Sequence, residues 1–401
     1  MKVEQFEIQI PDQALTDLRD RLENTRWPDE WDGAGWELGT DPSYLKRLVG
    51  YWQTGYDWRK EERELNQLSH FRTTIDDVAI HFIHEKGTGP DPMPLLLTHG
   101  WPDSFLRFRK IIPLLTDPGS HGGDPADSFD VVVPAMPGFP FSGMRENAGN
   151  IFHVHNLWAD LMTRVLGYQR FGAHGGDWGS IVTEHLARSH SELLVGIHLT
   201  DVPFTHTFQK PAHLSAAEEK FLADNQKWQM EQGAYNMIQS TRPQTLAAGL
   251  NDSPVGLAAW FVEKFQAWND CAGNLDECFG RDELITNIML YWLSESISTS
   301  FLPYYDMLNA GATTWIAEKF KEWAGSKEVP AAFALFPKDN SHPPREWAER
   351  FFHVQRWTKM ERGAHFAAME VPDLLAEDIR GFYRPLRQLE PKKETFATAR
   401  R

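Results

Sequence analysis

The stretch Gly175-Gly176-Asp177-Trp178-Gly179 decides the fold that we expect for this chain of 401 residues. An apolar run, residues 168–173, comes before it, and residues 180–188 follow with apolar side chains at helical spacing. A polar residue between glycines, where a strand meets a helix, is typical of a nucleophile elbow. Glycines permit the sharp turn, and the turn exposes the side chain at its centre. That side chain is Asp177.

Aspartate at this position predicts a particular chemistry. A carboxyl group with an ordinary pKa of about 3.9 is an anion at pH 7, so it needs no base to act as a nucleophile. It can displace a leaving group from an sp3 carbon and form an alkyl ester, which a second step must hydrolyse. The expected substrates are therefore epoxides or alkyl halides, and not ordinary esters. The alternative is that Asp177 only caps the helix after it, since aspartate is a favoured N-cap residue.

Outward from the elbow, short apolar runs alternate with helical stretches such as residues 156–166. Continuous apolar strands between helices indicate a mostly parallel sheet with helices on both faces. Together with the elbow, this pattern predicts an α/β-hydrolase fold. The runs that we interpret as strands are residues 78–82, 94–98, 129–133, 168–173, 194–199, 330–336 and 356–360.

The same patterns predict three parts of the chain. Residues 1–70 are helical and rich in tryptophan, which indicates a segment packed onto a larger body. Residues 71–202 and 326–401 form the hydrolase core, and a final helix covers residues 372–382. Residues 203–325 have no convincing strand and form a helical lid over the carboxyl edge of the sheet. The N-terminal segment either covers its own core or reaches a second copy in a homodimer.

Composition limits the classes of partner and the cellular compartment that we expect for this protein. The chain has 40 basic and 56 acidic side chains and a net charge of −16, which argues against nucleic acid and anionic membranes as partners. No apolar run approaches the ~18 residues of a membrane span, and the first residues have no signal-peptide core. Cys271 and Cys278 match no metal or redox spacing, which favours a reducing compartment. We expect a soluble cytoplasmic protein.

A second loop is predicted to complete the elbow. His99-Gly100-Trp101-Pro102 directly follows the predicted strand 94–98. In this fold, the loop after that strand supplies one backbone N–H to the oxyanion hole, and the residue after the nucleophile supplies the other. The expected donors are therefore the N–H groups of Trp101 and Trp178. Pro102 fixes the loop, and an X-Pro bond at this point can be cis.

The fold orders its triad as nucleophile, acid and histidine. Asp339 ends the first strand after the lid, and His365 follows the last strand in a glycine-containing loop. Both therefore fall at the carboxyl edge of the sheet, where His365 can activate a water molecule and Asp339 can orient its imidazole. Taken singly, the residues could be an exposed turn carboxylate and an ordinary histidine.

Opening an epoxide creates an alkoxide, which needs a hydrogen-bond donor as the C–O bond breaks. The triad offers no acid on that side, so the donor should come from the lid. Tyrosine is suited because it is a neutral donor with a pKa of about 10. Periodicity does not choose among the tyrosines of the lid, which are Tyr235, Tyr291, Tyr304 and Tyr305.

Over nearly its whole length, the sequence resembles epoxide hydrolases of the microsomal type, including their soluble bacterial and fungal members. That resemblance implies conversion of an apolar or aromatic epoxide and water to a vicinal diol, with no metal or organic cofactor. It also implies an N-terminal meander that wraps the core, and it assigns the two lid acids to Tyr235 and Tyr304. Microsomal members begin with a membrane anchor, and we expect none here, in line with a soluble enzyme. The matching motifs are His99-Gly100-Trp101-Pro102, Gly175-Gly176-Asp177-Trp178-Gly179-Ser180, Ser240-Thr241-Arg242-Pro243, residues 251–260, Phe336-Pro337-Lys338-Asp339 and residues 363–368.

Two other functions fit part of the sequence. A haloalkane dehalogenase would share the fold, Asp177 and His365, and the ring of Trp178 could donate to the departing halide. A catalytically silent hydrolase fold could bind a hydrophobic ligand or a partner, but such a protein should lack a member of the triad, and none is missing here.

Overall fold

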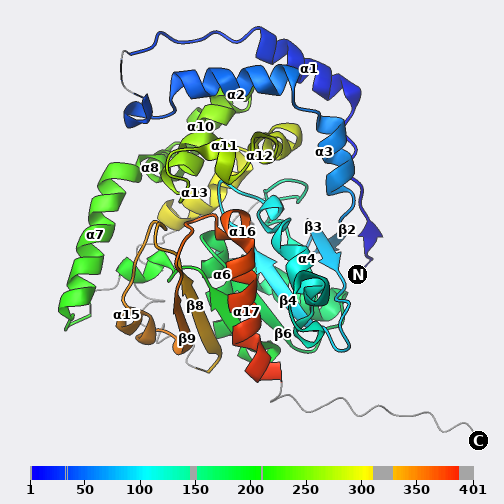
Figure 1. The fold of residues 1–401 in the computed structure, drawn as a ribbon, viewed down its shortest axis with the longest axis vertical. Helices are drawn as coiled ribbons and strands as arrows, with labels where there is room; N and C mark the ends of the chain where they lie inside the picture. Colours follow the sequence, from blue (N-terminus) through cyan, green and yellow to red (C-terminus); the bar gives the residue numbers. More distant parts are fainter. Residues whose placement is uncertain are drawn as a thin grey trace, which may run out of the picture.

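The computed structural model describes residues 2–31, 33, 35–144, 151–208, 211–309 and 328–387. At its centre is a sheet of nine strands in the order β1-β2-β3-β5-β4-β6-β7-β8-β9 (Figure 1). The strands are β1 (Glu4–Gln5), β2 (His70–Ile75), β3 (Val78–Glu85), β4 (Met93–Thr98), β5 (Phe129–Pro134), β6 (Phe171–Gly175), β7 (Leu194–Leu199), β8 (Pro330–Leu335) and β9 (His353–Lys359).

The central part of the sheet is parallel. Strands β5, β4, β6, β7, β8 and β9 all run in one direction, whereas β1, β2 and β3 are joined to each other and to β5 by antiparallel pairing. Every residue of β5 and β7 is buried, as expected for strands covered on both faces. The carboxyl ends of β4, β6, β7 and β8 therefore meet at one edge. This arrangement is the α/β-hydrolase fold that the sequence predicted.

Helices cover both faces of this sheet and its carboxyl edge. Contacts place α4 and α17 on one face and α5 and α6 on the other (Figure 1). The α-helices are α1 (Asp12–Glu23), α2 (Pro42–Thr54), α3 (Trp58–Leu65), α4 (Ile111–Thr116), α5 (Val154–Asp160), α6 (Trp178–Ser189), α7 (Ala216–Gln232), α8 (Ala234–Thr241), α9 (Pro243–Leu250), α10 (Pro254–Ala267), α11 (Leu275–Cys278), α12 (Arg281–Ser294), α13 (Leu302–Asn309), α15 (Arg345–Glu349), α16 (Ala367–Glu370) and α17 (Pro372–Arg387).

The strands differ from the sequence prediction in several places. Strand β1 was not predicted, β3 extends to Glu85, and β9 begins at His353. Strand β6 begins at Phe171 rather than at Tyr168, whose hydroxyl instead donates to Asp130 Oδ2 at 2.7 Å. Strand β2 was not predicted. It pairs with β3 through a two-residue turn at Asp76 and Asp77, both of which have positive φ angles of 46° and 64°. Aspartate tolerates this backbone region, so the pair allows a tight hairpin.

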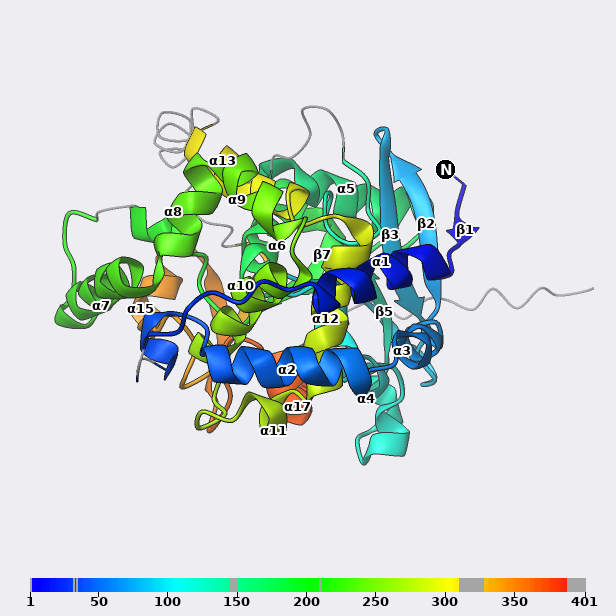
Figure 2. The ribbon, with the colours of Figure 1, turned by 90° about the horizontal axis from the view of Figure 1, so that it is seen from above.

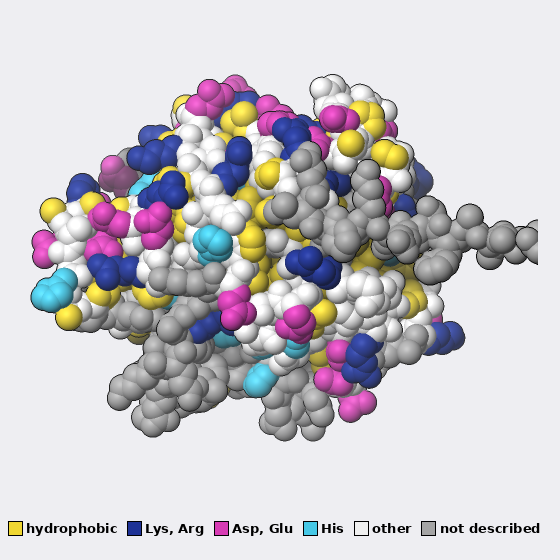
Figure 3. Space-filling model, turned by 90° about the horizontal axis from the view of Figure 1, so that it is seen from below, with side chains coloured by type: hydrophobic (Ala, Val, Ile, Leu, Met, Phe, Trp, Pro, Cys, Tyr) yellow, Lys and Arg dark blue, Asp and Glu magenta, His cyan; other side chains and the backbone are white. Residues whose placement is uncertain are grey.

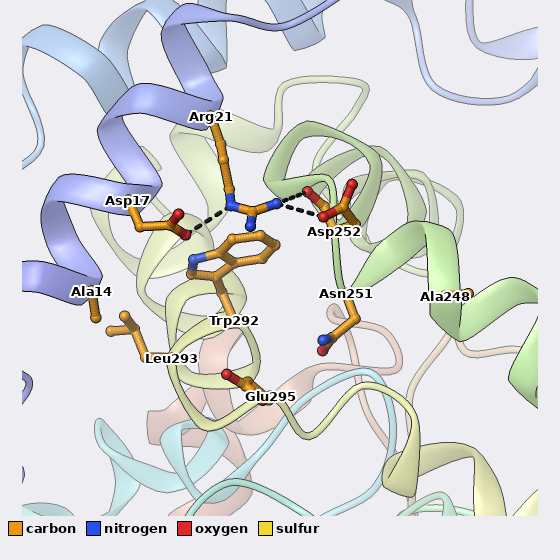
Figure 4. Close-up of a pocket in the computed structure, with 9 residues that line it drawn as sticks. All are labelled: Ala14, Asp17, Arg21, Ala248, Asn251, Asp252, Trp292, Leu293 and Glu295. Carbon is orange, nitrogen blue, oxygen red and sulfur yellow. Dashed lines mark hydrogen bonds and ion pairs between the residues drawn. The ribbon is translucent and has the colours of Figure 1, made fainter.

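The N-terminal helices lie on helices of the segment between β7 and β8. Helices α1 and α2 run across α10, and α3 contacts α12 (Figures 1 and 2). At one such contact, the Arg21 guanidinium donates to Asp17 and Asp252 and lies 5.6 Å from the centre of the Trp292 ring (Figure 4). The segment therefore packs on its own chain. Trp52 and Trp58 are buried, but Trp31 is 73% exposed, so not every N-terminal tryptophan serves as a packing surface.

The expectation of two reduced cysteines is wrong. Cys271, in the connection between α10 and α11, forms a disulfide with Cys278, the last residue of α11, and their Cα atoms are 5.5 Å apart. The seven-residue spacing did not reveal that this connection folds back on itself. The disulfide removes the argument for a reducing compartment.

No helix in the described part of the chain is long and apolar enough to cross a membrane. On the face shown in Figure 3, acidic and basic side chains are interspersed among the residues that the structure describes. The net negative charge is therefore not gathered into one patch on the visible part of this face.

Candidate active site

The nucleophile elbow joins β6 to α6. Asp177 has φ 56° and ψ −128°, a backbone conformation that an L-residue adopts only when its surroundings impose it. A Cβ atom at Gly179 would collide with the carbonyl of Thr98, and a Cβ atom at Gly100 would collide with the Asp177 carboxylate. Both glycines are thus needed for the loop after β4 to approach the elbow.

The two carboxylate oxygens of Asp177 have different surroundings. Oδ1 accepts hydrogen bonds from the backbone N–H of Trp101 at 3.0 Å and of Trp178 at 2.7 Å. Oδ2 lies 3.5 Å from Nε2 of His365. Asp177 does cap α6, but capping does not explain the donor from a separate loop or the facing imidazole. The Trp101–Pro102 bond is cis.

His365 lies between two carboxylates. Its Nδ1 is 3.0 Å from Oδ1 of Asp339, and its Nε2 faces Asp177. Its backbone N–H donates to the carbonyl of Trp268 at 3.2 Å, which ties the loop after β9 to the end of α10. Burial alone would lower the pKa of His365, but hydrogen bonds and charge from Asp177 and Asp339 outweigh burial and raise it to about 10.

Two tyrosines face the elbow from the helical segment. Tyr235 on α8 and Tyr304 on α13 are buried, and their ring centroids are 6.0 Å apart. The Tyr235 ring stacks on Trp101 at 5.5 Å, and the Tyr304 ring meets Trp178 edge-on at 4.8 Å. Burial, followed by the charge of Asp177, raises the pKa of Tyr235, and burial likewise raises that of Tyr304. Both phenols are therefore neutral donors at pH 7.

The other two candidate tyrosines are placed differently. Tyr305 is 41% exposed, on the outer side of α13. Tyr291 is buried, but its hydroxyl donates to the backbone carbonyl of Asp103 at 2.6 Å. The positions of the side chains thus distinguish Tyr235 and Tyr304, which face the elbow, from Tyr291 and Tyr305. Periodicity could not make this distinction.

The sequence analysis missed a buried ion pair, Asp103 with Arg107, that connects two loops of the site. Nη1 of Arg107 donates to Asp103 Oδ2 at 2.5 Å, and Nη2 donates to the carbonyl of His365 at 2.6 Å. Asp103 Oδ1 accepts the N–H of Gly100 at 3.0 Å. Arg107 therefore connects the loop after β4 with the loop that carries His365. The available signal was the i, i+4 spacing of Asp103 and Arg107 just after the His99-Gly100-Trp101-Pro102 motif.

Arg107→Met should lower the free energy of unfolding by roughly 3–5 kcal/mol, because it leaves the buried Asp103 carboxylate without its counterion. Urea unfolding measures this loss. Arg345→Met is the matched control, because the pair of Arg345 with Glu349 is about half exposed (side chains 50% and 48%) and should be worth at most about 1 kcal/mol. Equal losses in the two variants would contradict the assigned role of Arg107.

One group of potential metal ligands occurs among the described residues. It consists of Cys271, Cys278 and Glu370, and the two sulfur atoms are bonded to each other. The group lies near the loop that carries His365. There Glu370 accepts a hydrogen bond from the backbone N–H of Asp270 at 2.9 Å. As a disulfide, the cysteines offer no thiolate to a metal ion.

Comparison with known proteins identifies the family of this chain. The family model "Epoxide hydrolase N terminus" matches residues 3–108, and the model "alpha/beta hydrolase fold" matches residues 93–259. Epoxide hydrolase 1 of Sus scrofa is 37% identical over 409 aligned residues, covering 96% of this chain and 89% of its own. The chain belongs to the epoxide hydrolase family.

Two further similarities cover the whole architecture of this epoxide hydrolase. A protein of Stigmatella aurantiaca is 41% identical over 386 residues, covering 95% of this chain and 85% of its own. The solved structure of Aspergillus niger epoxide hydrolase superimposes with a TM-score of 0.81 at 27% identity and covers 96% of this chain and 97% of its own. The likeness thus includes the N-terminal helices and the helices that carry Tyr235 and Tyr304.

Proposed function

We propose that this chain converts an epoxide to a vicinal diol through a covalent hydroxyalkyl ester on Asp177. The observation that carries the proposal is the asymmetry of the Asp177 carboxylate. Its Oδ1 is held by the N–H groups of Trp101 and Trp178, while its Oδ2 is turned toward His365. Oδ2 is therefore the atom that attacks, and Oδ1 becomes the carbonyl oxygen of the ester.

In the first step, Oδ2 bonds to a ring carbon as the carbon–oxygen bond of the epoxide breaks. Tyr235 and Tyr304 hydrogen-bond the departing oxygen, and one phenol transfers its proton to it. The raised pKa of both phenols keeps them neutral, so each retains a proton, and the developing alkoxide is basic enough to take it. The proton of the phenol is restored from the His365 imidazolium, because Asp177 is now an uncharged ester and no longer raises the pKa of the imidazole.

In the second step, neutral His365 takes a proton from water, and the resulting hydroxide attacks the ester carbonyl of Asp177. The negative charge that develops on Oδ1 lies against the N–H groups of Trp101 and Trp178, which are already in place. The tetrahedral intermediate expels the product alkoxide, which takes the proton from His365. The acid form of Asp177 then gives its own proton to His365, which restores the starting state.

The aromatic rings around the elbow support an apolar or aromatic epoxide as the substrate class. Trp101, Trp178, Tyr235 and Tyr304 pack on one another, and Phe301 lies against Trp101 at 6.1 Å. Diol formation from a panel of aryl and alkyl epoxides tests the proposal. Halide release from haloalkanes without diol formation would favour the dehalogenase instead. Size-exclusion chromatography with light scattering tests for a homodimer.

Tyr235→Phe and Tyr304→Phe should each slow ester formation by about 10²-fold, because each removes one donor to the developing alkoxide. Ester hydrolysis should keep its rate, since neither phenol contacts the attacking water in this mechanism. Single-turnover kinetics separates the two steps. Tyr305→Phe is the matched control and should form the ester at the parent rate. A Tyr235→Phe variant as fast as the parent would contradict the assignment.

A further inference from the structure

Asp201 lies beside the elbow, two residues after the end of β7, and the mechanism above gives it no role. Its Oδ1 accepts the backbone N–H of Asp177 at 3.0 Å. Its Oδ2 lies 2.8 Å from Oγ of Ser180, a fully buried residue in the first turn of α6. The Asp201 side chain itself is partly buried.

The contacts of Ser180 bear on the protonation of Asp201. Its Oγ lies 2.7 Å from the backbone carbonyl of Asp177 and 2.8 Å from Asp201 Oδ2. A carbonyl can only accept, and so can an ionised carboxylate, but a hydroxyl has a single proton to donate. The single proton of Ser180 serves both contacts only if the two acceptors share it. Each contact has its own proton when Ser180 donates to the carbonyl of Asp177 and Asp201 Oδ2 carries a proton that it donates to Ser180 Oγ.

We propose that Asp201 is a positioning residue that acts as a neutral carboxylic acid and holds both backbone polar groups of the nucleophile. Oδ1 holds the N–H of Asp177 directly, and the protonated Oδ2 holds the carbonyl of Asp177 through the hydroxyl of Ser180. These two bonds fix a residue whose positive φ is intrinsically unfavourable. They thereby keep its carboxylate aligned with the two N–H donors on one side and with His365 on the other.

The charges around Asp201 favour its neutral form. Removal from water raises its pKa, the negative charges of Asp339 and Asp177 add to this effect, and the pKa reaches about 7. The hydrogen bond with Ser180 and the charge of His365 oppose the rise. The cation of Arg107 is also close, because its Nη2 and Asp201 Oδ1 both border Gly176.

Ionisation of Asp201 should therefore weaken the site as the pH rises through about 7. An ionised Oδ2 would compete for the proton of Ser180, and the Asp177 carbonyl, which also accepts the backbone N–H of Ser180 at 3.0 Å, would lose its hydroxyl donor. It would also add a third negative charge to the pair formed by Asp177 and Asp339. This inference rests on the proposed function, because the role that it gives Asp201 is to position the proposed nucleophile, Asp177.

The decisive variant is Asp201→Asn. An amide accepts through its oxygen and donates through its nitrogen, so it reproduces the hydrogen bonds of the neutral acid but cannot ionise. At pH 6, Asp201→Asn should form the ester within about threefold of the parent rate, whereas Asp201→Leu should lose about 10- to 100-fold through misplacement of the nucleophile. Ser180→Ala should lose about 10-fold, because it cuts only the relay to the carbonyl.

The pH profile separates positioning from mere structural support. Between about pH 6 and pH 9, the parent should slow in ester formation as Asp201 ionises, and Asp201→Asn should show no such decline. Glu370 is a second group near the His365 loop whose pKa burial raises to about 7. Glu370→Gln is therefore the matched comparison, and it should retain the decline of the parent.

Carbon-13 NMR of aspartate labelled at the carboxyl group measures the protonation without any substrate. The signal that is missing in Asp201→Asn should titrate near pH 7 rather than near the ordinary value of about 3.9. Titration below about pH 5, or an Asp201→Asn variant as slow as Asp201→Leu, would overturn the proposal. Because this titration requires no turnover, a parent that opens no epoxide would refute the proposed function while the protonation of Asp201 is still decided.

Discussion

Asp177→Ala should form diol at least about 10⁴-fold more slowly than the parent, because it removes the only atom that bonds to the substrate carbon. The loss should appear in ester formation, and mass spectrometry of the intact variant should find no adduct at any time. Folding should be preserved, because alanine removes the carboxylate without adding bulk to the elbow.

The control for this variant is Asp224→Ala on α7. The Asp224 side chain is 63% exposed and pairs with Lys220 on the surface, so its loss changes the charge by the same amount far from the elbow. It should turn over epoxide at the parent rate. Undiminished diol formation by Asp177→Ala would falsify the assignment of the nucleophile.

The second large effect is expected in His365→Gln, which should form the ester but hydrolyse it about 10²- to 10⁴-fold more slowly. The imidazole is needed to deprotonate water, whereas Asp177 is an anion before any base acts. One equivalent of epoxide should be consumed in a burst. The intact mass should then rise by the mass of the epoxide, and digestion should locate the increase on the peptide that contains Asp177.

Asp339→Asn serves as the companion to this variant. It keeps an acceptor near His365 Nδ1 but removes the charge that raises the pKa of the imidazole and stabilises the imidazolium. The ester should accumulate here too, although with a faster decay than in His365→Gln. Failure of both variants to accumulate an ester, while diol formation stops, would show instead that ester formation itself requires the histidine.

The sequence alone determined the parts of this protein that depend on local order. The glycines around Asp177, the apolar strands and the turn residues after each strand are short-range signals, because backbone geometry depends on neighbouring residues. In a parallel sheet, the carboxyl ends of strands share one edge, so the position of Asp177, Asp339 and His365 after strands was enough to place them at that edge. Strand β2 was not predicted, because most of its residues are polar and its place in the sheet depends on pairing with β3.

Tertiary structure decided what depends on contacts between distant segments. The choice of Tyr304 over Tyr305 follows from which side of α13 faces the elbow. The sequence periodicity of one short helix does not indicate that side. The disulfide and the bond from Arg107 to the His365 carbonyl, 258 residues away in the chain, depend on how loops meet in space. The proposed protonation of Asp201 depends on two oxygens, the carbonyl of Asp177 and Oδ2 of Asp201, that contact the hydroxyl of Ser180. Burial and proximity set these properties, and both arise only when the chain is packed.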